Sequence, residues 1–531
     1  MKSTRFALTC LLLSFLLLLA AGPSVAQFTD TVGQAPNGSY YKFRVPDGWQ
    51  PANGLVIWNH GFSLSPLDTD PDLGPFADVQ VAQGYAVAAS SYSQIGWALF
   101  QIEEDLEQMV DAFEAAYGVP DQVIVTGASL GGAVTATAIE QADLGNVVGA
   151  FPICGAMAGS RVWNGAFDLR LLYDYVCSDV PGAAIPGGAT GLPFPPDPNF
   201  DETALGLAIE ACFGVISGNP DADQQARLAT ILQVSGLPDV PFLLTDLGFS
   251  TFALADLTFD PTKLAGGQGL GNYGVDYGDP AVNAGITRVM ADPDAAYRLH
   301  ENYTPSGKVG DVKIVSIHTD KDGLVLVENQ NEYASKVPAS NLTVGIVVED
   351  VPSHCDFTDA ESIAAWESLR AWIAGAPQPT VAAIQAGCEA IEGGGLADGP
   401  CRYDAEFVVP SLDDRVRPRE TCEQGGNVLC LNEGRFKVTV AWEDFEGQTG
   451  NGTILPQTDD TGAFWFFNSA NLELMVKVLD GRQENGHFWV FYGSLTNVGF
   501  TLTVTDTTTG ITKTYDNPVG QFASNGDTEA F

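Results

Sequence analysis

Ser129 lies in the pentapeptide Gly127-Ala128-Ser129-Leu130-Gly131, directly after the apolar run 123–126. A run of small residues that favours a helix follows, beginning at Gly132. A serine in such a strand-to-helix turn is typical of a nucleophile elbow, in which small neighbours let the chain turn sharply and expose the serine hydroxyl. An ordinary turn is the alternative, but the strand before the motif and the helix after it favour the elbow. We interpret Ser129 as a candidate catalytic nucleophile.

A serine nucleophile needs a histidine to take its proton and a carboxylate to hold that histidine. In chains with this elbow the order is serine, acid, histidine, with the acid and the histidine on loops after later strands. His354 fits, because it follows a predicted strand at 342–348. Asp322 follows a predicted strand that ends at Ile317, and Asp320 in the same loop is the alternative acid. We favour Asp322 because it lies deeper in the turn.

Two backbone N–H groups must stabilise the negative charge that develops on a carbonyl oxygen when a serine attacks it. The residue after the nucleophile, Leu130, is expected to supply one of them. The other is expected from the loop 59–62, which follows a predicted strand, with Phe62 as the donor. Tyr92 and Trp97 are expected at the same edge of the sheet, where they either line a pocket or pack.

The remaining histidines have structural interpretations. His318 stands at a predicted strand end, His300 in a region outside the strand pattern, and His487 in a distant β-rich region. Because the five histidines are scattered along the chain, the sequence predicts no metal site. A serine, histidine and aspartate set also needs no cofactor.

Alternating strand-like and helical segments surround these residues. Apolar runs predict strands at 41–45, 55–58, 86–89, 123–126, 147–153, 312–317 and 342–348. Apolar residues at helical spacing predict a helix at 102–117, and another at 359–374 begins with a capping box of Thr358 and Glu361. Such alternation predicts an α/β fold, a mainly parallel sheet with helices on both faces.

Changes in composition divide the chain further. Residues 1–26, with Lys2 and Arg5 before an apolar stretch, are typical of a secretory signal. Residues 27–376 form the predicted α/β domain, interrupted at about 159–307 by a cap or lid rich in proline and glycine, with a floppy insertion as the alternative. Residues 377–402 are predicted to be a linker, and alternating apolar residues in 403–531 predict an antiparallel β sandwich.

The charge balance restricts the partners. With 24 Lys and Arg against 66 Asp and Glu, the net charge is −42, so we exclude nucleic acid as a partner. After the signal, no segment is expected to be long and apolar enough to span a bilayer, and no membrane anchor is predicted. The mature chain is expected to be soluble and secreted, either extracellular or periplasmic.

The cysteine count favours disulfides. Of nine cysteines Cys10 lies in the signal, and the remaining eight are an even number, as expected for an exported protein. Proximity in the sequence suggests three pairs and leaves the fourth: Cys422 with Cys430, Cys388 with Cys401, Cys177 with Cys212, and Cys154 with Cys355.

Over about 40–376 these residues resemble the α/β-hydrolase superfamily. The loop 59–62, the serine motif and the His354-Cys355 pair are similar to those of secreted carboxylesterases and polyester depolymerases. Tannase-type feruloyl esterases also have a cysteine beside the histidine, but theirs is bonded to a cysteine just before the serine, where this chain has Ala128. The resemblance implies the α/β-hydrolase fold and a secreted serine hydrolase that cleaves carboxylic esters, with bulky or polymeric esters among the expected substrates.

From about 430 to 531 the chain is similar to a β module appended to many secreted bacterial proteins. Its aromatic clusters suggest either binding to a surface or polymer, or an ordinary core. Two other functions stay open for the whole chain. One is a serine peptidase of the prolyl-peptidase type, although no propeller repeats precede the predicted core. The other is a non-catalytic adhesion protein, which the intact order of Ser129, Asp322 and His354 disfavours.

Overall fold

The computed structural model describes residues 27–531 except 188–199, 274, 396, 398, 413–421, 423, 433, 482–484, 486 and 507–510. The predicted signal, residues 1–26, and the proline-rich run Pro193-Phe194-Pro195-Pro196 lie outside the described residues. The chain divides into two compact units. The first comprises the described part of Met1–Met157 together with Pro305–Pro410, and the second comprises Ala158–Thr304 and Ser411–Phe531.

The first unit is built on an eight-stranded sheet with the order β1-β2-β4-β3-β5-β6-β7-β8. β2 runs antiparallel to both of its neighbours, β1 and β4. The strands from β4 to β8 pair in parallel along that order. The strands are β1 (Phe28–Gln34), β2 (Tyr40–Pro46), β3 (Leu55–Asn59), β4 (Ala86–Ser90), β5 (Val123–Ala128), β6 (Val147–Ile153), β7 (Lys313–Thr319) and β8 (Leu342–Val347).

Burial of the central strands explains why continuous apolar runs in the sequence predicted them. Every residue of β3 and β4 is buried, as expected for parallel strands covered on both faces. All seven predicted strands are confirmed, with end shifts of one or two residues. β1 was not predicted, because it is a largely exposed edge strand that pairs with only one neighbour and has the mixed sequence FTDTVGQ.

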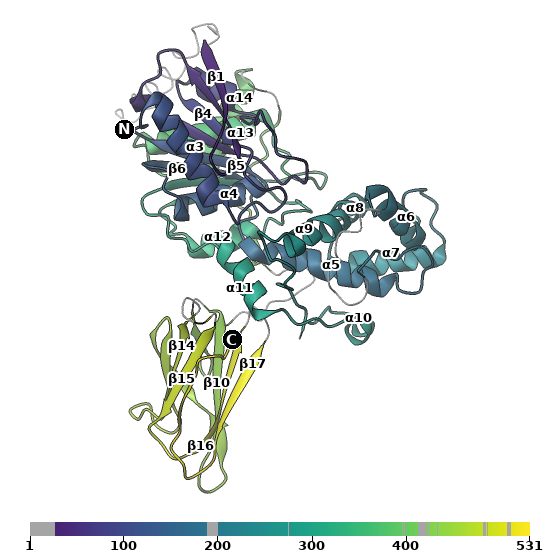
Figure 1. Cartoon of the computed structure of the whole chain (residues 1–531), viewed down its shortest axis with the longest axis vertical. Helices are drawn as coiled ribbons and strands as arrows, with labels where there is room; N and C mark the ends of the chain where they lie inside the picture. The colour runs from purple at the N-terminus through teal and green to yellow at the C-terminus, as the bar shows by residue number, and fades with distance from the viewer. Residues whose placement is uncertain are drawn as a thin grey trace, which may run out of the picture. The chain divides into compact units, whose positions relative to one another are not determined.

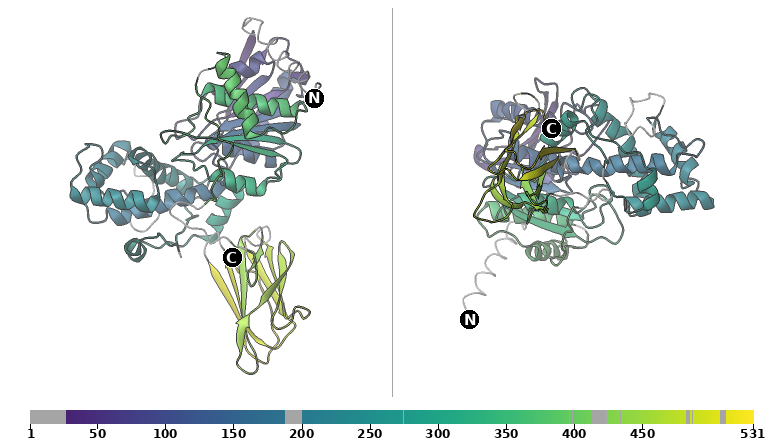
Figure 2. Two further views of the ribbon diagram at one scale, coloured as in Figure 1. Left: turned by 180° about the vertical axis from the view of Figure 1, so that it is seen from behind. Right: turned by 90° about the horizontal axis from the view of Figure 1, so that it is seen from below.

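Helices cover both faces of this sheet. α3 and α4 lie on the face toward the viewer in Figure 1, and α13 and α14 lie on the opposite face, seen in the left view of Figure 2. The predicted helices at 102–117 and 359–374 are confirmed, the second with its capping box. The helices of this unit are a short 3-10 turn (Pro51–Asn53), α2 (Ala77–Ala82), α3 (Ile102–Tyr117), α4 (Leu130–Gln141), α12 (Asn329–Lys336), α13 (Asp359–Ile373) and α14 (Val381–Gly393).

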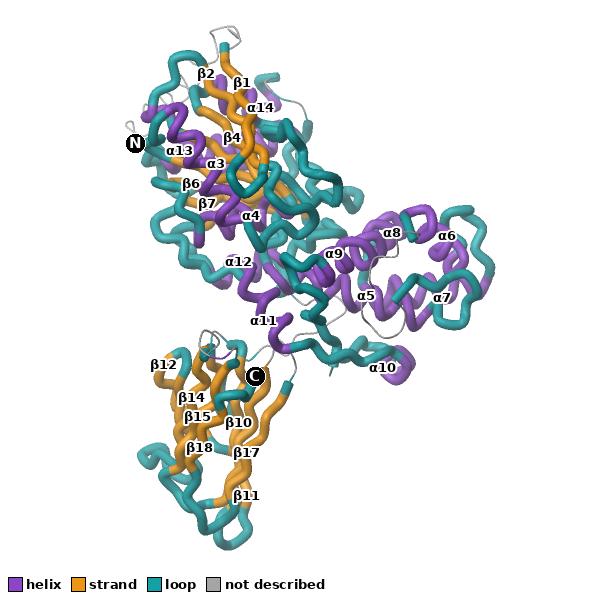
Figure 3. The backbone as a smooth tube through the Cα atoms, in the orientation of Figure 1, coloured by secondary structure: helices purple, strands orange, loops and turns teal. Residues whose placement is uncertain are grey.

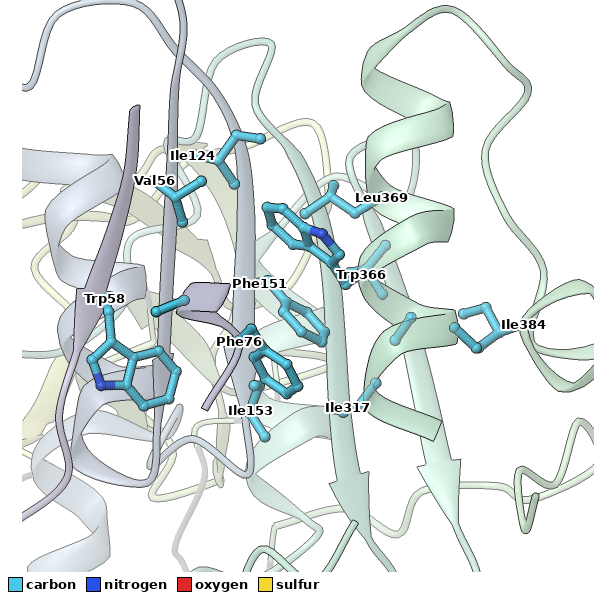
Figure 4. Packing of buried hydrophobic residues seen from close by; sticks show 14 of the residues in the cluster. Val56, Trp58, Phe76, Ile124, Phe151, Ile153, Ile317, Trp366, Leu369 and Ile384 are labelled. Carbon is cyan, nitrogen blue, oxygen red and sulfur yellow. The ribbon is translucent and has the colours of Figure 1, made fainter. Parts of the chain in front are cut away.

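A core of aromatic and branched side chains joins α2, α13 and α14 to the sheet. Trp366 of α13 packs against Phe151 of β6, with ring centroids 6.3 Å apart, and Phe76 lies 6.4 Å from the same ring (Figure 4). Burying such large apolar side chains is the main favourable contribution to folding. This core holds the strand ends from which the candidate residues project.

The prediction of a linker at 377–402 is wrong. α14 occupies half of it, and its apolar residues Ile384 and Ile391 are buried in the same core as Trp366. Tyr403 then forms a bridge to Val347 at the end of β8. The prolines and glycines that suggested a linker flank this helix and do not interrupt it, so the first unit continues to Pro410.

The insertion between β6 and β7 is mostly helical, which the proline and glycine content did not indicate (Figure 3). Its two ends meet, because Ser160 N–H donates a hydrogen bond to the carbonyl oxygen of Tyr303 over 2.8 Å. Its helices are a 3-10 turn (Gly159–Arg161), α5 (Val162–Val176), α6 (Glu202–Phe213), α7 (Ala222–Ser235), α8 (Val240–Gly248), a π-helical turn (Phe249–Ala253), α9 (Leu254–Phe259), α10 (Pro280–Gly285) and α11 (Pro293–Asn302).

One helical run in the insertion corrects an expectation about membranes. The continuous run Val240–Phe259 has 20 residues and a mean hydropathy of 1.3, so it is long and apolar enough to cross a bilayer. Half of its most apolar stretch is buried inside the protein. Length and composition alone therefore do not separate this run from a core helix, and the expectation that no segment passes this test is wrong.

The C-terminal region consists of two five-stranded antiparallel sheets, drawn in orange in Figure 3. Their alternating inward side chains, such as Val438, Val476 and Leu502, form one apolar core, so the predicted sandwich is confirmed. The strands are β9 (Leu429–Leu431), β10 (Phe436–Glu443), β11 (Thr449–Asn451), β12 (Thr453–Thr458), β13 (Thr461–Trp465), β14 (Leu474–Asp480), β15 (Phe488–Ser494), β16 (Gly499–Asp506), β17 (Thr512–Asn517) and β18 (Ser524–Asp527).

All four disulfides suggested by the sequence are present. They join Cys154 to Cys355, Cys177 to Cys212, Cys388 to Cys401 and Cys422 to Cys430. The first of them closes a loop of 201 residues that contains the whole insertion, and it ties the end of β6 to the residue after His354.

Candidate active site

Ser129 forms the turn between β5 and α4. Its backbone has φ of 57° and ψ of −122°, in a region that residues with a side chain rarely adopt. The turn is held by a hydrogen bond from Ser129 N–H to the carbonyl oxygen of Ile153, at the end of β6, over 2.9 Å. The neighbouring strand therefore fixes the backbone that presents the serine hydroxyl.

The glycines of the motif are required by close backbone contacts. A Cβ on Gly131 would lie 2.0 Å from the carbonyl oxygen of Asn59, and one on Gly132 would lie 2.5 Å from the Cα of Gly155. Real Cβ atoms do not approach other atoms so closely, so no other residue fits without movement of the backbone. The tight packing of α4 against β3 and β6 explains why small residues follow the serine.

The structure brings Ser129, His354 and Asp322 together. Nε2 of His354 lies 2.9 Å from Oγ of Ser129, and Nδ1 of His354 lies 2.7 Å from Oδ2 of Asp322. The histidine follows β8 and the aspartate follows β7, as the sequence predicted. Parallel strands deliver all three side chains to the same edge of the sheet.

Asp322 is almost completely buried, with 2% of its surface exposed. Its Oδ1 accepts hydrogen bonds from the N–H groups of Leu324 and Val325, each over 2.9 Å. Burial alone would raise the pKa of this carboxyl, but hydrogen bonds from His318 and His354 outweigh burial and hold the pKa at about 2. Asp322 is therefore ionised at neutral pH and can stabilise a positive charge on His354.

Asp320, the alternative acid, has a different partner. Its Oδ1 accepts a hydrogen bond from the N–H of Glu349 over 2.8 Å, and its own N–H donates to the carbonyl oxygen of Val347 over 3.0 Å. Asp320 therefore joins the loops after β7 and β8. Of the two aspartates, the structure places Asp322 against His354.

The loop 59–62 lies against the candidate nucleophile. A Cβ on Gly61 would be 3.5 Å from the Cβ of Ser129 and 4.0 Å from its Oγ, so a glycine here leaves space beside the hydroxyl. Phe62 follows in the same loop, and Leu130 is the first residue of α4. The N–H groups of a first helical turn have no acceptor within the helix, which leaves that of Leu130 available to an oxyanion. The donor roles of Leu130 and Phe62 stay predictions.

Tyr92 packs against the loop 59–62 and holds it through His60. Its ring stacks on His60 with centroids 4.1 Å apart, and its hydroxyl donates a hydrogen bond to the carbonyl oxygen of His60 over 3.0 Å. Tyr92 is fully buried and Trp97 is 5% exposed, so of the two roles considered for them packing is the one that the structure shows. The sequence did not indicate that Tyr92 holds the loop.

A buried carboxylate holds the segment after Tyr92. Asp105 of α3 accepts hydrogen bonds from the N–H of Ser93 over 2.9 Å and from the side-chain amide of Asn37 over 2.6 Å. Burial raises the pKa of Asp105 to about 6, because these hydrogen bonds do not compensate for the loss of water.

The other histidines have different surroundings. His318 is fully buried, and its Nε2 lies 3.5 Å from Oδ2 of Asp322, so its interpretation as an ordinary strand-end residue missed this contact. The spacing of four residues between His318 and Asp322, on either side of one turn, was the signal in the sequence that could have indicated this contact. His300 contacts Thr304 in the insertion, and His487 contacts Phe531 in the sandwich.

Among the described residues, Asp322, His354 and Cys355 are close enough together to suggest a metal site. Sγ of Cys355 lies 3.4 Å from Nε2 of His354. This sulfur is bonded to Cys154, so it is not a thiolate and does not offer the ligand that such a site would need. The group is better described as a hydrogen-bonded pair beside a disulfide.

No protein-family profile matches the chain. Among curated proteins, an o-phthalyl amidase of Xanthobacter agilis is 26% identical over 411 residues, which are 65% of this chain and 88% of that protein. Among solved structures, the rice cell wall degrading esterase LipA of Xanthomonas oryzae has a TM-score of 0.33 and 13% identity, over 67% of this chain and 92% of its own. The esterase RhEst1 of Rhodococcus sp. ECU1013 has a TM-score of 0.31 and 18% identity, over 65% and 99%.

The strand order carries the assignment of the fold. A mainly parallel eight-stranded sheet with an antiparallel second strand, and a serine in a strained turn between a strand and a helix, are the defining features of one superfamily. The chain has the α/β-hydrolase fold.

Proposed function

We propose that the chain is a serine hydrolase that cleaves carboxylic esters through an acyl-enzyme intermediate. The observation that carries this proposal is the continuous set of contacts from Oγ of Ser129 to His354, 2.9 Å, and from His354 to Asp322, 2.7 Å. Neither a packing role nor a metal site requires a serine hydroxyl at the end of such a set of contacts. We assign Ser129 as nucleophile, His354 as general base and acid, and Asp322 as the group that orients His354.

The geometry performs the reaction in two halves. Nε2 of His354 takes the proton of Ser129 as Oγ attacks the ester carbonyl, and the N–H groups of Leu130 and Phe62 stabilise the resulting oxyanion. The protonated His354 then gives its proton to the leaving alcohol, and the acyl group stays on Oγ. In the second half His354 takes a proton from water while the water oxygen attacks the acyl carbonyl. The bond from the acyl carbon to Oγ then breaks, His354 returns the proton to Oγ of Ser129, and the carboxylic acid is released. Asp322 stays ionised throughout.

A second candidate substrate is an amide. The observation that favours it is the similarity to an amidase over most of that protein's length. The same residues cleave amides when His354 protonates the leaving amine, so the site itself does not select between the two bonds. Amide cleavage includes the peptidase alternative, and we keep it as the second candidate.

We also propose that the protein is secreted. Four disulfides in the described residues are typical of oxidising compartments, and residues 1–26 have the composition of a signal. The sandwich is proposed to attach the enzyme to a surface or polymer. Its exposed aromatic residue Phe467, whose ring lies 4.8 Å from that of Trp442, is a suitable contact.

The test compares the purified chain with Ser129→Ala on p-nitrophenyl esters from acetate to palmitate and on acyl p-nitroanilides. Ser340→Ala is the matched control, since Ser340 is exposed and lies on a loop before β8. We expect ester turnover that Ser129→Ala lowers by about four orders of magnitude and that Ser340→Ala leaves unchanged. Turnover of anilides alone would favour the amidase.

Labelling by a fluorophosphonate tests the non-catalytic alternative. An activated serine reacts covalently with this reagent, and an ordinary serine does not. We expect one label per chain on Ser129, absent from Ser129→Ala. A wild-type chain that takes no label and cleaves neither substrate class would contradict the proposal.

A further inference from the structure

Asp322 lies between two histidines, and the reaction described above uses only one of them. Nδ1 of His354 is 2.7 Å from its Oδ2, and Nε2 of His318 is 3.5 Å from the same oxygen. The side chains of His318 and Asp322 are both completely buried, whereas that of His354 is 22% exposed. His354 therefore faces the substrate side, and His318 lies behind the carboxylate.

The partners of His318 fix the direction of its Nε2–H. Its Nε2 lies 2.7 Å from the carbonyl oxygen of Val325, which accepts only a hydrogen bond, so Nε2 carries the proton. Its Nδ1 lies 3.0 Å from the side-chain amide nitrogen of Gln330. The amide oxygen of Gln330 lies 2.7 Å from Oγ of Ser316, which is also 3.3 Å from the carbonyl oxygen of Pro152. The N–H at Nε2 of His318 is thus directed toward the loop that carries Asp322.

The bond to Val325 closes the turn that carries the carboxylate. Val325 N–H donates to Oδ1 of Asp322 over 2.9 Å, while its carbonyl oxygen accepts from His318. His318 therefore ties Val325, the last residue of the turn 322–325, to β7. The N–H of Val325 then holds Oδ1 of Asp322 in place. With Oδ1 held, the carboxylate presents Oδ2 to His354. The hydrogen bonds from both histidines also keep the pKa of Asp322 low.

We propose that His318 is a positioning residue for the reaction: its Nε2–H holds the Asp322 turn so that Oδ2 faces Nδ1 of His354. The inference rests on the proposed function, because positioning has a kinetic meaning only if Asp322 orients His354 during turnover. His318 itself transfers no proton and does not contact substrate. Its partners Ser316 and Gln330, from β7 and α12, carry no charge, and Asp322 is the charged group that faces it.

A pair of amide substitutions separates positioning from packing. In His318→Gln the side-chain nitrogen reaches the place of Nε2, and in His318→Asn it reaches only the place of Nδ1. Both variants put an uncharged amide into the same buried space. We expect His318→Gln to keep kcat within about threefold and His318→Asn to lose about 100-fold in kcat with little change in KM, the loss typical of a misplaced catalytic group.

Three readouts accompany the kinetics. Rates are normalised to sites titrated with a fluorophosphonate, so that misfolded protein does not count. The acid limb of the pH profile of kcat/KM should move to lower pH in His318→Asn only, because the imidazolium of His354 loses part of its carboxylate partner. The low-field proton resonance of the His354 Nδ1–H, identified by its loss in His354→Ala, should persist in His318→Gln and be lost in His318→Asn. His487→Asn is the control and should behave as wild type.

The outcomes are distinguishable from failure of the proposed function. If wild type shows no turnover that depends on Ser129, the proposed function fails, and the resonance still compares the two variants. Equal kcat in His318→Gln and His318→Asn would overturn the inference, whether both are active or both inactive. A difference in thermal stability alone, with the same resonance and pH profile, would also overturn it.

Discussion

Two parts of the candidate site are held in place by different forces. The Ser129 turn has a hydrogen bond to Ile153, but it is marked above all by steric contacts, with a backbone at φ of 57° and a Gly131 whose Cβ would lie 2.0 Å from the carbonyl oxygen of Asn59. The loops that carry Asp322 and His354 are fixed by hydrogen bonds and by a disulfide. Sterics leave a signature in the sequence because only small residues fit. Hydrogen bonds leave less, because many residue types satisfy the same donors.

The largest expected effect lies in the hydrogen-bonded part. Asp322→Asn should lower kcat/KM for a p-nitrophenyl ester by about 10⁴-fold, because the amide holds the wrong tautomer of His354. Asp320→Asn should lower it by less than about tenfold, because Asp320 contacts the backbone of Glu349 and not His354. Steady-state kinetics on site-titrated protein measures both. Equal losses would show that the loop as a whole matters and that the choice of acid is wrong.

The disulfide beside His354 closes a long loop and should contribute more to stability than a disulfide of the sandwich that closes a short one. Closing a loop of 201 residues with Cys154 and Cys355 should stabilise the fold by about 5 kcal/mol, and closing a loop of 8 residues with Cys422 and Cys430 by about 2.5 kcal/mol. Paired Cys→Ser variants and thermal unfolding of the two regions test this. A larger loss for the short loop would contradict the loop-entropy argument.

The steric part should respond to one methyl group. Gly131→Ala should destabilise the first unit by about 3 kcal/mol, since backbone atoms of β3 must move to admit the Cβ. Gly165→Ala in α5 is the control: a Cβ there meets no atom within 4 Å, and alanine should stabilise that helix by about 0.5–1 kcal/mol. Denaturant unfolding followed by hydrolase activity provides the measurement. An unchanged midpoint for Gly131→Ala would mean that the turn is not held by sterics.

The smallest expected effect is the pH dependence of the free energy of unfolding, which two buried carboxyl groups, Asp105 and Asp322, should produce. Asp105 has a folded pKa raised to about 6, so the folded chain binds more protons than the unfolded one between about pH 4 and pH 6. Stability should therefore fall by about 2 kcal/mol as the pH rises through this window. Asp322 has the opposite sign: its low pKa adds stability above about pH 4 that is lost as the pH falls toward 2. Asp105→Asn should remove the first dependence in urea titrations at pH 4 and pH 6.5, and a slope that persists in this variant would assign it to another group.

The sequence predicted the parts of the fold that burial determines. The central strands and α3 are marked by apolar residues at the period of their secondary structure, so their positions were predicted to within two residues. β1 escaped prediction because a strand at the exposed edge needs no apolar pattern. α14 escaped because the proline and glycine residues around it suggested a linker, although its buried face follows helical spacing.

Within the site, the sequence indicated which three side chains lie together but not which residues support them. Ser129 and His354 follow from the motif and the strand order, and Asp322 from its depth in the turn. The roles of Tyr92 and His318 depend on contacts between residues 7 to 32 positions apart in the chain. A hydrogen bond to a backbone carbonyl oxygen leaves no pattern in the sequence, because every residue has such an oxygen.

The meeting ends of the insertion have a consequence for how such chains diversify. Because Ser160 and Tyr303 are hydrogen-bonded, the helices between them leave and rejoin the rest of the chain at one point. Because the chain enters and leaves the insertion at adjacent residues, a change in its length there would not alter the register of the sheet. Recombination at these two positions should therefore yield chimaeras that keep the strands of the sheet and the serine, histidine and aspartate. The same two positions are the natural junctions for a library of designed inserts.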